Sequence, residues 1–108
     1  MAKTTWKLVR DNIPAIMIAE GKTPETRILD AKSYKKALLA KLDEEVKELK
    51  LALQNNNSTN AIAEIGDVLE VLAAIAHDEA FPTDAIYDQA QEKRERVGAF
   101  LNRIQLKL

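Results

Sequence analysis

The sequence contains no cysteine, and this absence excludes several kinds of structure at once. A chain without cysteine has no disulfide framework, no zinc site built on thiolates and no thiol nucleophile. Glycine and proline are also scarce, with three residues of each among 108, and aromatic residues make up only 5%. Sheet proteins rely on aromatic and β-branched residues and on turn formers, so this composition favours helices.

The chain also lacks an excess of charge of one sign and a long hydrophobic run. Sixteen basic residues against seventeen acidic ones give a net charge of −1, which argues against nucleic acid as a partner. The longest apolar run, residues 71–76, is too short to cross a bilayer, and the first residues lack the apolar segment of a signal peptide. We expect one cytoplasmic domain over residues 1–108 that binds neither nucleic acid nor membrane.

The spacing of apolar residues predicts an all-α fold with two long antiparallel helices. Apolar side chains recur every three or four residues over 31–54 and again over 61–80, which is the period of an amphipathic helix. Polar, turn-forming residues fill the segment between them, 54–60. Asp30 and Asn60 are the expected N-caps of the two helices.

Shorter helices are expected on either side of this pair. Asp11 and Asn12 precede a helix that Pro14 can open and Gly21 can end. Thr83 is the expected N-cap of a last helix that runs to residue 97, and the apolar tail that follows should lie back on the body.

Two long helices give a limited core of their own. Sharing apolar stripes with a second copy across a two-fold axis would complete a four-helix bundle. We therefore expect a homo-oligomer.

The first long helix carries a cluster of carboxylates at residues 44–48, Glu-Glu-Val-Lys-Glu. At about 100° per residue, Glu45 falls inside the apolar arc of this helix and Glu48 just beyond its edge. Glu44 lies further round the helix, outside the core. One carboxylate should therefore face the core, with a second next to it.

The second long helix repeats this arrangement at Glu64 and Asp67, within Glu-Ile-Gly-Asp. Glu64 falls inside the apolar arc and Asp67 beside the same edge, and the spacing of three residues puts both on one patch. Unpaired buried carboxylates are costly and clustered ones repel each other, so bound cations would explain the pattern. Oxygen ligands alone favour Mg²⁺ or Mn²⁺.

Other interpretations of these carboxylates remain open on spacing alone. Glutamate-rich helices are common, and two such faces can arise by chance and simply be solvated. A di-iron bundle requires Glu-x-x-His on paired helices. The only histidine, His77, lies off the apolar arc and is expected to face solvent.

Residues 7–14, Lys-Leu-Val-Arg-Asp-Asn-Ile-Pro, resemble the KLVRDxIP opening of a set of small MazG-like, phosphoribosyl-ATP pyrophosphohydrolase-like proteins. The central signature of that family is EExxE followed, after a loop, by ExxD. Residues 44–48 and 64–67 match it in order, and residues 67–72 and 92–100 are also similar. The resemblance therefore covers nearly the whole chain.

The resemblance implies an all-α nucleoside triphosphate pyrophosphohydrolase, which cuts between the α- and β-phosphates and releases a nucleoside monophosphate and pyrophosphate. It implies that Glu45, Glu48, Glu64 and Asp67 bind Mg²⁺, for which Mn²⁺ is a possible substitute. It also implies a homodimer or a dimer of dimers. Glu48 and Glu44 are both candidates to take the proton of the attacking water, and Glu44 could instead only orient that water.

Cations are needed to neutralise the phosphates of such a substrate. Lys93 and Arg96, on the last helix, are the first candidates, with Arg10 and Lys7 next. The alternative for each is a solvated or salt-bridged surface residue, and Arg10 could pair with a carboxylate.

Three functions compete at this stage. The leading one is Mg²⁺-dependent hydrolysis of canonical or damaged (d)NTPs, which would clean the nucleotide pool. The second is the same chemistry on phosphoribosyl-ATP, although the KLVRDxIP opening and the absence of histidine just after Asp67 argue against it. The third is a non-catalytic helical module that binds a partner protein.

Overall fold

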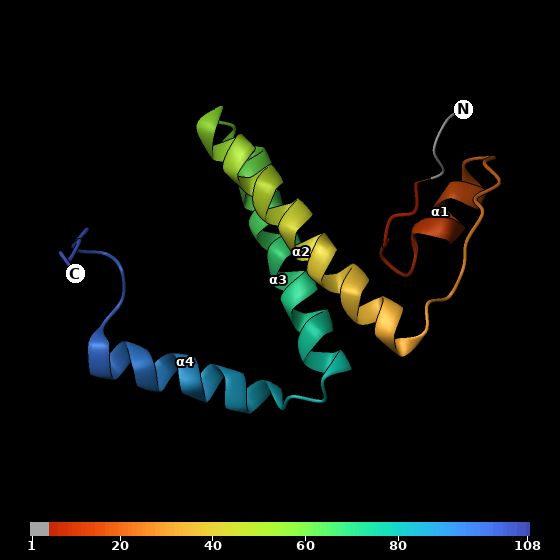
Figure 1. The fold of residues 1–108 in the computed structure, drawn as a ribbon. Coiled ribbons are helices and arrows are strands. Elements are labelled where there is room, and N and C mark those ends of the chain that lie inside the picture. Colours follow the sequence, from red (N-terminus) through yellow and green to blue (C-terminus); the bar gives the residue numbers. More distant parts are fainter. Residues whose placement is uncertain (1–4) are drawn as a thin grey trace. The chain divides into compact units, whose positions relative to one another are not determined.

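The computed structural model describes residues 5–108, and every regular element in this part of the chain is a helix (Figure 1). In chain order the helices are α1 (Ile13–Ala19), α2 (Ala31–Gln54), α3 (Ser58–Asp78) and α4 (Thr83–Val97). The predicted all-α class, with two long helices flanked by shorter ones, is confirmed.

The chain divides into two compact units, a first that extends to Ile75 and a second over Ala76–Leu108. The first contains α1, α2 and most of α3, and the second contains the last residues of α3, α4 and the C-terminal tail. The single domain expected over residues 1–108 stays a prediction.

Helix α1 begins and ends where the sequence predicted. Pro14 occupies its first turn, where a missing backbone N–H costs nothing. Gly21 ends it with a φ of +84°, a left-handed conformation that glycine adopts without steric cost. The backbone N–H of Lys22 then donates to the carbonyl of Met17 at 3.0 Å. An extended connector follows to the start of α2.

Helix α2 also matches its predicted bounds. The Asp30 side chain accepts a hydrogen bond from the backbone N–H of Ser33 at 2.7 Å, which satisfies one of the free donors of the first turn. The helix runs for 24 residues to Gln54.

The turn between α2 and α3 is shorter than predicted. Asn56 takes a φ of +53°, and the Asn57 side chain accepts a hydrogen bond from the backbone N–H of Asn60 at 3.2 Å. Asn57, rather than Asn60, therefore caps α3, which begins at Ser58 instead of residue 61. The sequence prediction was wrong here because several asparagines of this polar segment, together with Ser58 and Thr59, are plausible caps.

Helices α2 and α3 pack side by side as a hairpin (Figure 1). The most buried apolar side chains of the first unit lie on these two helices: Leu38, Ala52, Ala61 and Val71. Ala52 and Ala61 lie near the turn, close to the end of α2 and the start of α3. The core of the first unit is therefore a narrow seam between two helices.

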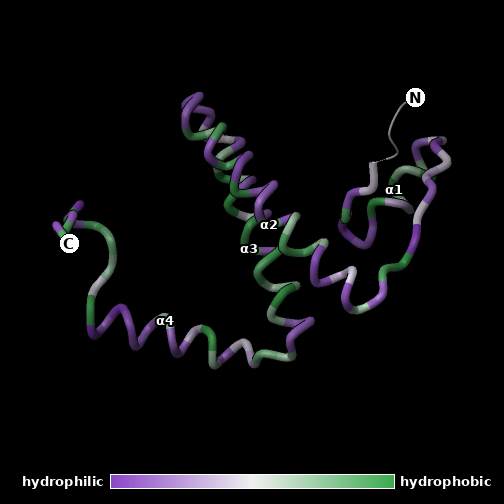
Figure 2. Tube along the Cα trace, in the orientation of Figure 1, coloured by the Kyte–Doolittle hydropathy of each residue, from purple (hydrophilic) through white to green (hydrophobic). Residues whose placement is uncertain are grey.

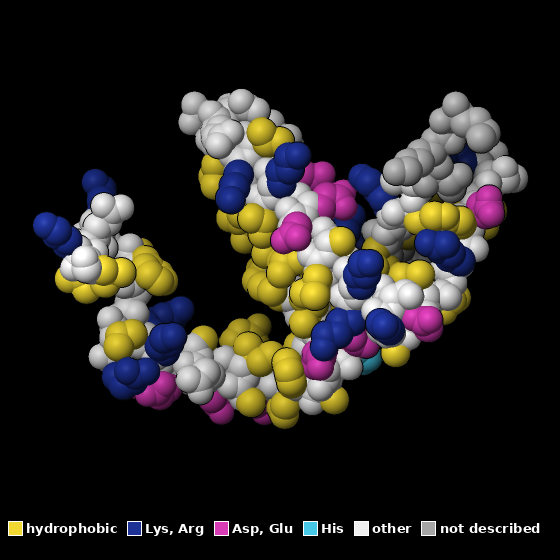
Figure 3. All heavy atoms as spheres, viewed as in Figure 1, with side chains coloured by type: hydrophobic (Ala, Val, Ile, Leu, Met, Phe, Trp, Pro, Cys, Tyr) yellow, Lys and Arg dark blue, Asp and Glu magenta, His cyan; other side chains and the backbone are white. Residues whose placement is uncertain are grey.

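Much apolar surface of this hairpin remains exposed. Figure 2 shows hydrophobic residues along both helices, and Figure 3 shows hydrophobic side chains on the face in view. Large apolar side chains that are exposed on the two helices are Leu39, Leu51, Leu53, Ile62, Ile65, Leu69 and Leu72. A single chain does not bury both faces of the hairpin. The predicted homo-oligomer, which would cover such a face, stays a prediction.

In the second unit, α4 ends at Gly98, whose φ is +89°. The predicted cap at Thr83 is wrong, because Thr83 is already helical and the N-cap position falls to Pro82, which has no side-chain acceptor. The expected packing of the apolar tail on the body stays a prediction, and within the second unit Phe100 and Leu108 are exposed.

Among the described residues, no helix is long and apolar enough to span a membrane.

Candidate metal centre

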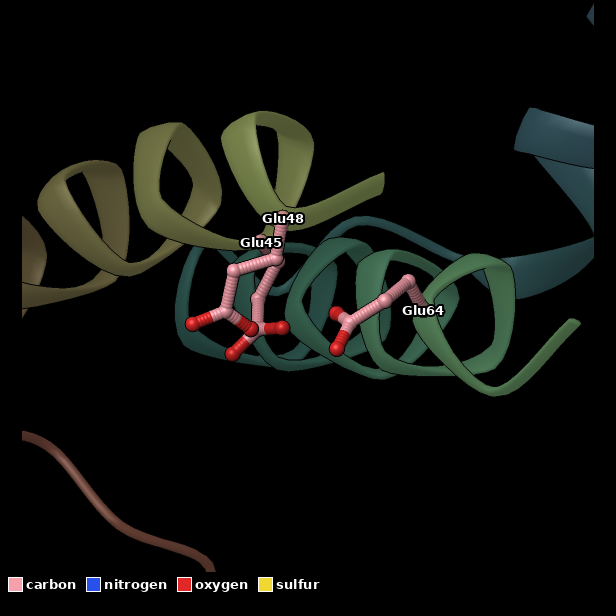
Figure 4. A group of neighbouring side chains, drawn as sticks. All are labelled: Glu45, Glu48 and Glu64. Carbon is pink, nitrogen blue, oxygen red and sulfur yellow. The ribbon is translucent and has the colours of Figure 1, made fainter. Parts of the chain in front are cut away.

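Three carboxylates converge on one side of the α2–α3 hairpin. Glu45 and Glu48 come from α2 and Glu64 from α3, and each offers an oxygen within 4.8 Å of the others (Figure 4). The spacing of three residues puts the two α2 side chains on one patch, and the antiparallel hairpin brings Glu64 to face them. We call these three residues the acidic centre.

The acidic centre is partly withdrawn from water. Glu45 is only 6% exposed and is the one charged residue classed as buried among residues 5–108. Its Oε2 atom and that of Glu64 are inaccessible and accept no hydrogen bond from any described residue. Burying polar atoms without a partner is costly. Orphaned carboxylate oxygens facing one another are the donor set that fits a hard divalent cation.

The proximity of these carboxylates changes the pKa of Glu64. Its contact with the Glu45 carboxyl, together with burial and the charges of Glu45 and Glu48, raises the pKa of Glu64 from 4.5 to about 7. Like charges at short distance disfavour the ionised form. The pKa of Glu64 therefore lies near neutral pH, and a bound cation would favour its ionised form.

Two lysines lie against the first carboxylate cluster. Lys41 Nζ is 3.4 Å from Glu45 Oε1 and 3.4 Å from Glu44 Oε2. Lys7 Nζ donates to Glu44 Oε1 at 3.0 Å, and this hydrogen bond is the main reason why the pKa of Glu44 is lowered. Glu44 is thus paired with cations beside the acidic centre, as its predicted place outside the core implied.

Asp67 has a different partner. Arg10 Nη2 donates to Asp67 Oδ1 at 2.6 Å, and Asp67 is not among the three carboxylates that converge. The structure therefore brings together three of the four predicted metal ligands and places the fourth one turn along α3, in an ion pair.

Two hollows of the first unit adjoin these carboxylates. A cleft of about 760 Å³ lies between the N-terminal segment, α1 and the hairpin, and Arg10, Lys41, Glu45 and Asp67 line its charged part. A smaller hollow of about 280 Å³ near the α2–α3 turn is lined by Glu48 and Glu64 and by asparagines of the turn. The acidic centre is accessible from both.

The remaining predicted residues lie elsewhere in the chain. Lys93 and Arg96 are on α4 in the second unit, and Arg96 Nε donates to Glu92 Oε1 at 3.0 Å. His77 is exposed, as predicted. Lys41 was missed by the sequence analysis, although its spacing of three and four residues from Glu44 and Glu45 is a usable signal.

Comparison with known proteins gives a family and a partial relative. The family model described as phosphoribosyl-ATP pyrophosphohydrolase matches residues 13–94. An uncharacterized protein from Mycolicibacterium smegmatis (strain ATCC 700084 / mc(2)155) is 54% identical over 46 residues, which are 43% of this chain and 47% of that protein. The match thus spans about half the length of this relative. No solved structure matches.

The family model covers both long helices and the carboxylates at 44–48 and 64–67. It ends within α4 and begins at the first residue of α1. The protein belongs to the phosphoribosyl-ATP pyrophosphohydrolase family.

Proposed function

We propose that this protein is a Mg²⁺-dependent nucleoside triphosphate pyrophosphohydrolase, which cleaves the α–β phosphate bond of (d)NTPs and yields a nucleoside monophosphate and pyrophosphate. The observation that carries the proposal is the convergence of Glu45, Glu48 and Glu64, with two buried oxygens that have no partner in the described chain. Nucleotide-pool sanitation is the role we propose for this activity.

The residues that would hold Mg²⁺, or Mn²⁺ in its place, are Glu45, Glu48, Glu64 and Asp67. When bound, the ions would neutralise the phosphates and lower the pKa of a bound water. The three converging carboxylates would supply oxygen ligands from two helices. Asp67, which is paired with Arg10, would be the fourth ligand if it left Arg10.

The surroundings of Glu44 and Glu48 favour Glu48 as the base that takes the proton of the attacking water. Glu44 is held by Lys7 and Lys41, and the hydrogen bond from Lys7 lowers its pKa, which makes it a weaker base. Glu48 is exposed and lines the smaller hollow. Glu44 would instead hold Lys7 and Lys41 in place.

Cations near the acidic centre would bind the triphosphate. Lys41 and Arg10 line the larger cleft, and Lys7 lies against Glu44. Arginine and lysine are the usual partners of phosphate oxygens. Lys93 and Arg96 of α4 remain proposed ligands of the leaving pyrophosphate, from this subunit or from another.

A second candidate is the reaction named in the description of the matching family, hydrolysis of phosphoribosyl-ATP. It breaks the same kind of bond and would use the same carboxylates. The KLVRDxIP-like opening and the residues after Asp67, Val-Leu in place of histidine, favour (d)NTPs. A helical partner-binding module without catalysis is a third candidate. It does not explain why three carboxylates converge in the acidic centre.

The assembly that we propose is a homodimer or a dimer of dimers in the cytoplasm, without a nucleic-acid or membrane partner. The exposed apolar side chains on α2 and α3 support it, since exposed apolar faces are common subunit interfaces.

Turnover of a substrate panel tests the proposal. NTPs, dNTPs, modified nucleotides and phosphoribosyl-ATP are incubated with Mg²⁺, and pyrophosphate and orthophosphate are measured separately. We expect pyrophosphate as the first product with (d)NTPs, loss of activity in a chelator, and loss of activity in Glu64→Gln. Asp43→Asn, an exposed carboxylate on α2, is the matched control and should retain activity.

Three results would contradict the proposal. Orthophosphate as first product excludes α–β cleavage, and turnover of phosphoribosyl-ATP alone favours the second candidate. No turnover of any substrate, with a melting temperature that Mg²⁺ does not shift, favours the non-catalytic module, because a ligand of the folded state must raise that temperature.

A further inference from the structure

Arg10 and Asp67 form an ion pair that links distant parts of the first unit. The N–O distance is 2.6 Å, and the two residues are 57 positions apart in the sequence. Arg10 belongs to the non-helical segment 5–12, which we call the arm, and Asp67 lies one turn beyond Glu64 on α3. A residue placed to complete the acidic centre is thus held by a cation of the arm.

This ion pair can be broken at low cost. The side chains are 58% and 38% exposed, and ion pairs with this degree of exposure contribute little to stability. A divalent ion at the neighbouring carboxylates carries twice the charge of the guanidinium. Asp67 would therefore exchange Arg10 for the ion when the acidic centre is loaded.

Arg10, once released, is well placed to bind an anion. It lines the cleft of about 760 Å³ together with Lys41, Glu45 and Asp67. A guanidinium binds phosphate oxygens with two parallel hydrogen bonds. Metal binding would not release Lys7 in the same way, because its partner Glu44 is not one of the converging carboxylates.

We propose that Arg10 exchanges partners: it holds Asp67 in the metal-free protein, and it binds a phosphate group of the substrate when Asp67 has turned to a metal ion. The inference rests on the proposed function for the identity of the anion. Arg10 can then bind phosphate only after the metal site is filled. The metal-free protein therefore does not hold the nucleotide through Arg10.

The exchange can be tested without metal and without turnover. Asp67→Asn removes the carboxylate that holds Arg10, so the metal-free variant should bind inorganic pyrophosphate about two- to five-fold more tightly than wild type in calorimetry. Glu70→Gln is the matched control, since it removes one negative charge from the same cleft but leaves the ion pair intact. The double variant Arg10→Gln, Asp67→Asn should lose the gain.

Equal pyrophosphate affinity in Asp67→Asn and Glu70→Gln would overturn the proposal, and so would a gain that persists in the double variant. Both outcomes would show that Arg10 does not become the ligand. Thermal melting of each variant checks that it is folded.

Binding of Mn²⁺, measured by electron paramagnetic resonance, tests the other half of the exchange. Arg10→Gln frees Asp67 and should tighten Mn²⁺ binding more than Lys7→Gln, which removes the same charge nearby without freeing Asp67. Equal effects contradict the exchange but leave the proposed hydrolase intact. If wild type binds no Mn²⁺, the proposed function fails, whereas the metal-free pyrophosphate experiment still tests Arg10.

Discussion

The ion pairs within the two units of this chain differ in sequence separation. In the first unit, ion pairs join residues far apart in the sequence, Lys7 with Glu44 over 37 positions and Arg10 with Asp67 over 57. In the second unit, the pair Arg96–Glu92 lies within one helix turn of α4. The acidic centre is therefore a product of tertiary structure, whereas the contacts described in α4 are those of any surface helix.

Burial follows the same division. Leu38 and Val71 of the first unit are almost fully buried, while α4 has no buried residue among those described. Most helical stability in proteins comes from packing of an apolar face rather than from propensity. We conclude that packing within the first unit positions the candidate site.

The largest expected effect is a loss of stability on truncation of Leu38, which is 3% exposed. Leu38→Ala should lower the free energy of unfolding by about 3–4 kcal/mol, because it leaves a cavity in the seam of the hairpin. Ile86→Ala on α4, where the side chain is 45% exposed, should cost less than about 1 kcal/mol. Urea denaturation of both variants measures the difference, and equal losses would contradict the division described above.

The next effect is a pH dependence that originates in the acidic centre. The raised pKa of Glu64, about 7 against 4.5, means that folding favours its protonated form. The stability from this group is complete below pH 4.5 and is lost as the pH rises through about 7. Metal-free protein should therefore lose stability over that range, and the loss is smaller where the neighbouring carboxylates share the proton.

Thermal melting between pH 4.5 and 8, without metal, measures this slope. Glu64→Gln should flatten it, whereas Glu95→Gln on α4 should leave it unchanged. Addition of Mg²⁺ at pH 8 should restore stability, because the ion replaces the proton. A slope that persists in Glu64→Gln would show that the pH dependence has another origin.

The sequence predicted the parts of this molecule that depend on local chemistry. The cap at Asp30, the stop at Gly21 and the end of α2 at Gln54 follow from rules that involve a few neighbouring residues. The cap of α3 could not be assigned in the same way, because several asparagines compete and only the geometry of the turn selects Asn57.

In the candidate site, too, the sequence predicted what depends on neighbouring residues and not what depends on tertiary contacts. Facing on each helix predicted that Glu45 and Glu64 point inward, and the two carboxylates do lie together. The separation of Asp67 from them depends on where the arm places Arg10. Helical periodicity does not predict that Arg10 lies beside Asp67. This contact depends on the path of the chain from the arm through α1 and the connector to α2.

The smallest expected effect distinguishes the two kinds of ion pair. Double-mutant cycles on Lys7–Glu44 and on Arg96–Glu92 should each give less than about 1 kcal/mol, because both pairs are largely exposed. The two ion pairs should nevertheless affect amide hydrogen exchange in different parts of the chain. Loss of Lys7 in Lys7→Gln removes the contact of the arm with Glu44 of α2, while Arg10 stays paired with Asp67. It should speed amide hydrogen exchange near residue 7 and return the pKa of Glu44 toward its ordinary value. Loss of Glu92 in Glu92→Gln should increase exchange only at the end of α4. Exchange that rises in the arm for both variants would mean that the two units are not energetically separate.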